Sequence, residues 1–169
     1  MRKPSSLLPL TFGLLIASNS VHAEATAPPA TPTPAAPALD FGNFSSEVIT
    51  GKAWDAFNAK NLPTAKAYAQ KCVDMYKDKA VEMQKALSAP ATEKEEIFKS
   101  WALNDVGVCY FILGQALEAE GKGKDAIAPY KFLADNLSYA QCWDVKGWFW
   151  KPADAARERV KALEFDALK

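Results

Sequence analysis

Apolar residues recur at intervals of three and four along the chain from Ser45 onward, as they do on one face of a helix. No stretch shows the strict alternation of apolar and polar residues that is typical of a half-buried strand. We therefore predict an all-α protein built from antiparallel helix pairs. About five helices are expected, at residues 46–59, 63–87, 92–120, 124–136 and 152–165.

Residues that favour turns and caps mark the ends of these helices. Pro63 and Pro152 stand in first helical turns, where the missing N–H of proline costs no hydrogen bond. Residues 92–95 (Thr-Glu-Lys-Glu) have the pattern of a capping box, in which the two side chains each accept a hydrogen bond from a free backbone amide. The Gly-Lys-Gly at residues 121–123 predicts a tight turn, and residues 137–151 are expected to form a loop.

Small and bulky side chains are spaced so that two helices of a pair can approach closely. Gly114 and Ala126 are twelve residues apart, and Ala53 and Ala65 repeat this offset. A glycine or alanine on one helix leaves room for a bulky side chain of its neighbour. The residues expected to pack the helix pairs are Ala53, Ala65, Tyr110, Leu113, Gly114, Leu117, Ala126 and Tyr130.

The pattern Y-x2-LG-x2-L-x8-A-x3-Y, from Tyr110 to Tyr130, resembles the tetratricopeptide (TPR) signature. The chain departs from that signature at Leu117, where an aromatic residue is usual, and at Ser138, where a closing proline is usual. The two motifs are also 61 residues apart, whereas a regular repeat has about 34. The resemblance implies a TPR-like, short right-handed solenoid, and a plain helical bundle is the alternative.

Residues 1–23 have the pattern of a cleaved signal peptide. A positively charged start is followed by an apolar run at residues 7–17 and by Val-x-Ala at residues 21–23. That run is too short for a helical membrane span, which needs about twenty residues. Residues 24–40 are rich in proline, alanine and threonine, a composition typical of a disordered linker. We expect a periplasmic or secreted protein whose folded domain covers residues 41–169.

Composition argues against several kinds of chemistry in the mature chain. Removal of the signal peptide would also remove His22, the single histidine, and with it the basis of Ser-His-Asp and Cys-His catalysis. The remaining 18 basic residues face 20 acidic ones, so no basic surface for nucleic acid is expected. Three scattered cysteines without C-x2-C spacing do not resemble a zinc site. We expect a protein that is not an enzyme and that has no cofactor or metal.

The cysteines become oxidisable if the chain is exported. Cys72 lies 18 residues before Pro90, and Cys109 lies 19 residues after it, so an antiparallel helix pair that turns at this proline places both at the same level. A Cys72–Cys109 disulfide is therefore the preferred pairing, worth a few kcal/mol. Alternatively, both residues are buried thiols that act as small apolar groups. Cys142 would be left free, or it would replace either partner.

The resemblance also implies a concave surface, made by the first helix of each pair, that binds a peptide or a helix of another envelope protein. Three of the five tryptophans fall within residues 143–150, where their rings either bind a ligand or cap the end of the helical stack. The residues expected to bind a partner are Trp54, Phe57, Asn104, Asp105, Val108, Trp143, Trp148 and Trp150.

The leading hypothesis is a non-enzymatic scaffold or interaction module of the cell envelope. One rival is a carbohydrate- or cell-wall-binding accessory protein that uses the tryptophan-rich loop and is associated with a glucan-active enzyme. A second rival is an envelope hydrolase, for which two opposed carboxylates in a cleft would be needed. The sequence singles out no such pair.

Overall fold

The computed structural model describes residues 38–169. The predicted signal peptide and most of the predicted linker lie outside these residues. The last residues of that linker, however, are part of the folded domain. Leu39 packs against the hydrophobic core, and Asp40 Oδ2 accepts a hydrogen bond of 2.7 Å from Lys52 Nζ.

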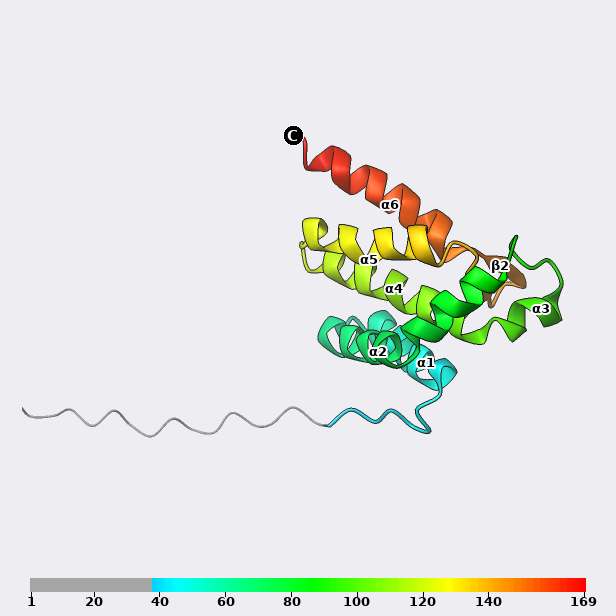
Figure 1. Cartoon of the computed structure of the whole chain (residues 1–169). Helices are drawn as coiled ribbons and strands as arrows, with labels where there is room; N and C mark the ends of the chain where they lie inside the picture. The colour runs from blue at the N-terminus through cyan, green and yellow to red at the C-terminus, as the bar shows by residue number, and fades with distance from the viewer. Residues whose placement is uncertain (1–37) are drawn as a thin grey trace, which may run out of the picture. The chain divides into compact units, whose positions relative to one another are not determined.

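Within residues 38–169 the chain forms six helices and one small β-hairpin (Figure 1). The elements are α1 (Ser46–Asn58), α2 (Leu62–Ala86), α3 (Lys94–Lys99), α4 (Trp101–Ala119), α5 (Gly123–Asn136), β1 (Cys142–Asp144), β2 (Trp148–Trp150) and α6 (Pro152–Asp166). The prediction of a mainly all-α fold is confirmed. None of these helices combines the length and the apolar character that crossing a membrane requires.

The predicted third helix is in fact two helices, α3 and α4, which meet at Ser100. Asn104 accounts for the break, because its side-chain Nδ2 donates a 2.7 Å hydrogen bond to the carbonyl oxygen of Ile97. A continuous α-helix would pair that oxygen with the amide four residues later. The predicted capping box is wrong: the N-cap residue of α3 is Glu93, and no side chain caps this helix.

The loop expected at residues 137–151 contains a β-hairpin, so the prediction of a chain without strands is also wrong. The paired residues are Cys142 with Trp150, Trp143 with Phe149, and Asp144 with Trp148. The turn is closed by Asp144, whose Oδ1 accepts a hydrogen bond of 2.8 Å from the amide of Lys146. Gly147 follows with a φ of 102°, a conformation that favours glycine. Strands of three residues are too short for alternation to reveal them.

The helices stack in the order of the chain (Figure 1). α1 packs against α2, and α4 packs against α5. α4 also contacts both helices of the first pair, and α6 contacts both α4 and α5. The first helix of each later pair therefore rests on both helices of the pair before it.

The turns that join α1 to α2 and α4 to α5 have the same backbone geometry, although their sequences differ. Lys60 and Gly121 occupy equivalent places and have φ values of 61° and 75°. The hydrogen bonds of the first turn are Ala59 N to Asp55 O, Lys60 N to Phe57 O and Asn61 N to Ala56 O; those of the second are Glu120 N to Ala116 O, Gly121 N to Glu118 O and Lys122 N to Leu117 O. Each bond recurs 61 residues later, which is also the offset between the two small-residue motifs.

Gly114 lies where α4 and α5 approach each other most closely. A Cβ atom at this position would lie 2.5 Å from Cζ of Tyr130, a distance that real side chains do not adopt. Tyr130 and Ala126, both on α5, are completely buried. The Tyr130 hydroxyl donates a hydrogen bond of 2.7 Å to Glu118 Oε1 on α4, which fixes the ring in place. The glycine is thus required by the aromatic ring that fills its place.

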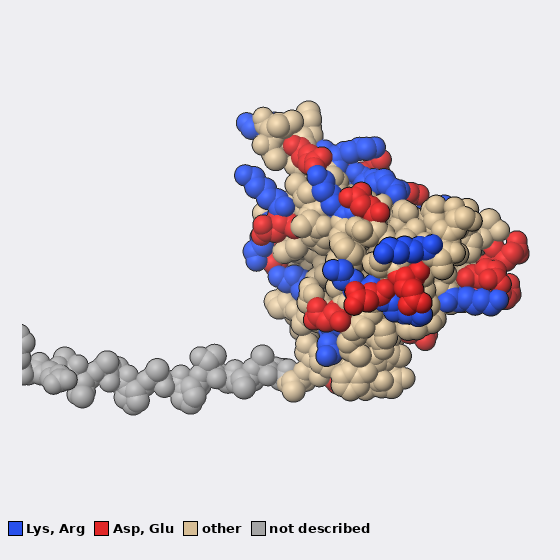
Figure 2. Space-filling model, in the orientation of Figure 1, with Lys and Arg blue, Asp and Glu red and all other residues tan. Residues whose placement is uncertain are grey.

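Charged side chains of both signs are interspersed on the face of the molecule shown in Figure 2. Some of them join neighbouring helices. Lys131 on α5 pairs with Glu164 on α6, with 2.5 Å between Nζ and Oε1, and Arg159 on α6 pairs with Glu118 on α4. Such exposed ion pairs contribute little to stability. The stack is therefore held mainly by its apolar interior.

The contact between Gly114 and Tyr130 predicts how two otherwise similar substitutions will differ. Gly114→Ala should lower the free energy of unfolding by roughly 1–3 kcal/mol, because the added methyl group forces the Tyr130 ring to move. Gly51→Ala is the matched control, since Gly51 is also in a helix but has no atom within 4 Å of an added Cβ. It should raise the free energy of unfolding by about 0.5–1 kcal/mol. Urea unfolding followed by circular dichroism measures both, and equal effects would contradict this packing.

Candidate functional site

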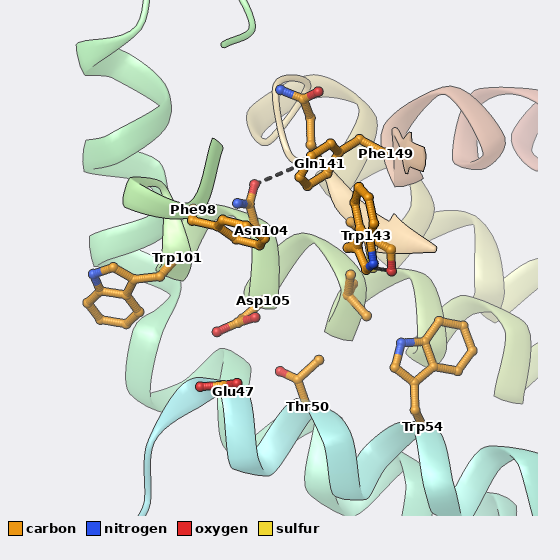
Figure 3. A pocket seen from close by; sticks show the side chains of 12 residues that line it. Glu47, Thr50, Trp54, Phe98, Trp101, Asn104, Asp105, Gln141, Trp143 and Phe149 are labelled. Carbon is orange, nitrogen blue, oxygen red and sulfur yellow. Dashed lines mark hydrogen bonds between the residues drawn. The ribbon is translucent and has the colours of Figure 1, made fainter. Parts of the chain in front are cut away.

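A cleft of about 410 Å³ lies between α1, the α3–α4 segment and the β-hairpin (Figure 3). Its lining residues are Glu47, Thr50 and Trp54 from α1, Phe98, Trp101, Asn104, Asp105 and Val108 from α3 and α4, and Gln141, Cys142, Trp143 and Phe149 from the hairpin region. Helical spacing of three and four residues explains why these side chains share one face of α1 and one face of α4.

Five of the eight residues expected to bind a partner line this cleft: Trp54, Asn104, Asp105, Val108 and Trp143. Phe57 does not line it. Its ring packs against the edge of Trp54, with 6.0 Å between the ring centroids, so it supports a residue of the cleft wall.

The three tryptophans of the hairpin differ in what they contact. Trp150 packs against the hydrophobic core, with its ring 5.3 Å from that of Phe111, and so it covers the end of the stack. Trp143 lines the cleft and is 43% exposed. Trp148 is 49% exposed and does not line the cleft. The two roles considered for these rings, capping and binding, are therefore divided among them.

Asn104 builds the wall of the cleft and has no free polar atom for a partner. Its Nδ2 donates to Ile97 O, and its Oδ1 accepts a 2.9 Å hydrogen bond from the amide of Gln141. The side chain of Gln141 is buried and donates a 2.8 Å hydrogen bond to Ala91 O. These bonds attach the start of the hairpin to the α3–α4 segment.

Asp105 places a carboxyl group in the floor of the cleft, and its pKa is raised to about 6. Loss of hydration on burial is the main cause; a hydrogen bond donated by Ser46 Oγ lowers the pKa, and the negative charge of Glu47 raises it. Figure 3 shows Glu47 close to Asp105, across from it on α1. In residues 38–169 no lysine or arginine forms an ion pair with Glu47 or Asp105.

Aromatic rings surround these carboxyl groups. The ring of Phe149 lies edge-on to Trp143 and to Phe98, at centroid distances of 4.9 and 5.6 Å. Lys94 Nζ lies 4.8 Å from the ring centroid of Trp143 and 5.8 Å from that of Phe98. The rim therefore already holds one cation against its aromatic faces.

A second hollow of about 310 Å³ adjoins the cleft and shares three of its residues, Glu47, Trp101 and Asp105. Its other side is formed by Tyr76, whose ring lies edge-on to Trp101 at 5.5 Å. The two carboxyl groups are thus accessible from both hollows. Together the hollows form a continuous groove past Glu47 and Asp105.

Cys72 and Cys109 lie behind the cleft as buried free thiols. Both sulfur atoms contact the same hydroxyl group, Thr50 Oγ1, at 3.5 Å and 3.2 Å. Burial, followed by the nearby Cys72 side chain, raises the pKa of the Cys109 thiol. The level that the sequence predicts for the two cysteines is thus the level at which they lie, and the disulfide between them stays a prediction. Burial also raises the pKa of the Cys142 thiol, to about 11.

Sequence reasoning missed seven of the lining residues: Glu47, Thr50, Phe98, Trp101, Gln141, Cys142 and Phe149. Helical spacing could have found some of them. Glu47 and Thr50 share the face of Trp54, and Trp101 shares the face of Asp105 and Val108. No comparable signal exists for Phe98 or Phe149, because their positions depend on the break at Ser100 and on the hairpin.

No known protein family, curated protein or solved structure matches this chain. Among residues 38–169 there is no cluster of three or more His, Cys, Asp or Glu side chains that could hold a metal ion. The interpretation of the cleft therefore rests on its own geometry and chemistry.

The raised pKa of Asp105 predicts a pH-dependent cost in stability. The folded chain retains the proton up to about pH 6, whereas the unfolded chain loses it near pH 4, so ionisation of Asp105 destabilises the fold as the pH rises across this interval. Asp105→Asn removes that charge and keeps an acceptor for Ser46 Oγ. At about pH 8 the variant should be more stable than the wild type by up to roughly 3 kcal/mol, and near pH 3 the two should be equal.

Urea unfolding of both proteins across this pH range measures the difference and cancels the contributions of all other titrating groups. A variant that is less stable than the wild type at about pH 8 would show that Asp105 is instead stabilised by a partner in the fold.

The cysteine pair predicts a thiol count for the exported protein. Protein recovered from an oxidising compartment and denatured without reductant should contain one reactive thiol per chain, that of Cys142. After reduction it should contain three. Alkylation followed by mass spectrometry makes the count, and Cys142→Ser should leave no reactive thiol before reduction. Three reactive thiols in the unreduced wild type would refute the bridge.

Proposed function

We propose that this chain is a non-enzymatic, exported, TPR-like interaction module of the cell envelope. Its cleft between α1, α4 and the hairpin binds a peptide segment of another envelope or secreted protein. The observation that carries the proposal is the position of that cleft: it is built by the first helices of the two hairpins and is lined by half-exposed aromatic rings. Aromatic side chains of this kind dominate the energetics of protein interfaces.

The arrangement of the helices supports the TPR-like part of the proposal. The two hairpins share the hydrogen bonds of their turns at a constant offset of 61 residues. Each later first helix contacts both helices of the preceding pair, as in stacked helical repeats. The long α2 and the additional α3 account for the excess over a regular repeat length.

The pattern of residues 1–23 supports export to the periplasm or the exterior. An exported chain without a membrane span reaches other envelope proteins directly, so a peptide partner in that compartment is accessible to the cleft.

The carbohydrate-binding alternative rests on one observation, the exposed ring of Trp148. A sugar-binding surface would need several free aromatic faces side by side. Of the other two hairpin tryptophans, Trp150 packs on the core, and the ring of Trp143 is already contacted by Phe149 and Lys94. A peptide that enters the cleft accounts for more of the exposed aromatic surface than a sugar on Trp148 does.

The hydrolase alternative gains the pair Glu47 and Asp105, because the fold brings these carboxyl groups into one cleft. Hydrolysis of a cell-wall glycan by the mature chain, abolished by Glu47→Gln, would replace binding with catalysis as the function of the site.

Selection from a displayed random-peptide library against the mature chain tests the proposal. Selected peptides should lose at least roughly tenfold in affinity, about 1.4 kcal/mol, for Trp54→Ala, because the ring forms one wall of the cleft. Trp148→Ala is the matched control, an exposed tryptophan outside the cleft, and should leave the affinity unchanged.

Two results would overturn the proposal. One is a selection that yields no peptide above background. The other is binding that depends on Trp148 and not on Trp54, and glucan binding measured by calorimetry with the same two variants would then test the carbohydrate alternative.

A further inference from the structure

We propose that the cleft recognises a basic side chain, arginine or lysine, as the anchor of the bound peptide, through the carboxylates of Glu47 and Asp105 and the aromatic rings beside them. This inference rests on the proposed function and names the chemistry that the partner must present.

The first argument is charge. Asp105 lies in the floor of the cleft and Glu47 at its edge, and each is without a lysine or arginine partner in the part of the chain that the structure describes. The only polar contact to Asp105 comes from Ser46 Oγ, a neutral donor. Two neighbouring carboxylates repel each other when both are ionised. A cation from outside the chain would relieve this repulsion and replace the hydration that burial has removed.

The second argument is the aromatic surroundings. Trp54, Trp101 and Trp143 line the same cleft as the carboxyl groups. The faces of aromatic rings attract ammonium and guanidinium groups, with tryptophan the most favourable. Lys94 shows this attraction at the rim, where its ammonium lies 4.8 Å from the ring centroid of Trp143. A second carboxylate or a neutral polar group would gain neither the charge attraction nor the ring contacts.

The third argument is space. A cleft of about 410 Å³ is large enough for a long side chain, and the adjoining hollow of about 310 Å³ leaves room for the peptide on the other side of Glu47 and Asp105. Arginine fits this setting best, because its planar guanidinium group can stack on a ring while its N–H groups bind a carboxylate.

Short peptide pools with one fixed central residue and randomised flanking positions test the inference on the mature chain. One pool carries arginine at the centre, and its matched pool carries citrulline, which has nearly the same shape and no charge. Pools with lysine and glutamate complete the set. Fluorescence anisotropy of labelled pools should show binding of the arginine pool at least roughly tenfold tighter than that of the citrulline pool.

The substitutions Glu47→Gln and Asp105→Asn together should reduce binding of the arginine pool to the level of the citrulline pool. Asp55→Asn is the control, because Asp55 is an exposed acid of α1 that does not line the cleft. If the double variant does not fold, Glu47→Gln alone serves, since Glu47 is exposed; it should reduce the preference for arginine at least roughly threefold.

The preference for arginine should also weaken as the pH falls through about 6, because Asp105 then becomes neutral. Other titratable or charged groups near it are Glu47 on α1, Cys109 on α4 and Cys142 on β1, and Lys94 on α3 lies at the rim. The thiols remain neutral throughout this range because their pKa values are raised. Asp105→Asn should therefore flatten the pH profile above about pH 5.

The outcomes separate the two proposals. Equal binding of the arginine and citrulline pools, with loss of both in Trp54→Ala, would overturn the cation anchor and leave peptide binding in place. A preference for glutamate, or a preference for arginine that survives in the double variant, would also overturn it. Failure of every pool to bind would overturn both the anchor and the proposed function.

Discussion

The close approach of α4 to its neighbours is the contact on which the rest of the structure depends. α4 packs against α1, α2, α5 and α6 and carries more buried residues than any other helix between residues 38 and 169. Two glycines allow this: a Cβ on Gly114 would overlap the ring of Tyr130, and a Cβ on Gly107 would lie 2.5 Å from Cβ of Ala140. Gly114 sets the distance to α5, and Gly107 sets the distance to the segment that leads into the hairpin. Because α4 also carries Asp105, the same contacts fix the geometry of the cleft.

The cleft combines features that conflict unless a ligand is bound. Aromatic surface favours burial, whereas a carboxylate loses free energy when it loses its hydration. The fold compensates Asp105 with a single hydrogen bond from Ser46 and places a second acid, Glu47, beside it. Perturbed groups in concave sites are often functional, since stability alone would not retain them. A basic partner side chain resolves the conflict, and this is why the binding and the chemistry of the cleft are argued together.

The helical pairing was largely predictable from the sequence, and the site was predictable only in part. Spacing of three and four, the turn at Gly121 and the small residues at 114 and 126 all report local or pairwise constraints, which the sequence carries directly. The break at Ser100 depends on Asn104 reaching back to Ile97, and the hairpin depends on strands of only three residues. Neither leaves a periodic signal. The cleft residues on α1 and α4 could therefore be anticipated, whereas the wall formed by Phe98 and Phe149 could not.

Photo-crosslinking in cells that produce the protein tests the central claim most directly. A benzophenone side chain replaces Phe98, an aromatic residue of the cleft that is 51% exposed, or Phe165, a residue of α6 that is 63% exposed and lies outside the cleft. The account predicts that position 98 alone is joined to an envelope protein, within a segment that contains arginine or lysine. Crosslinks from position 165 and none from position 98 would contradict it.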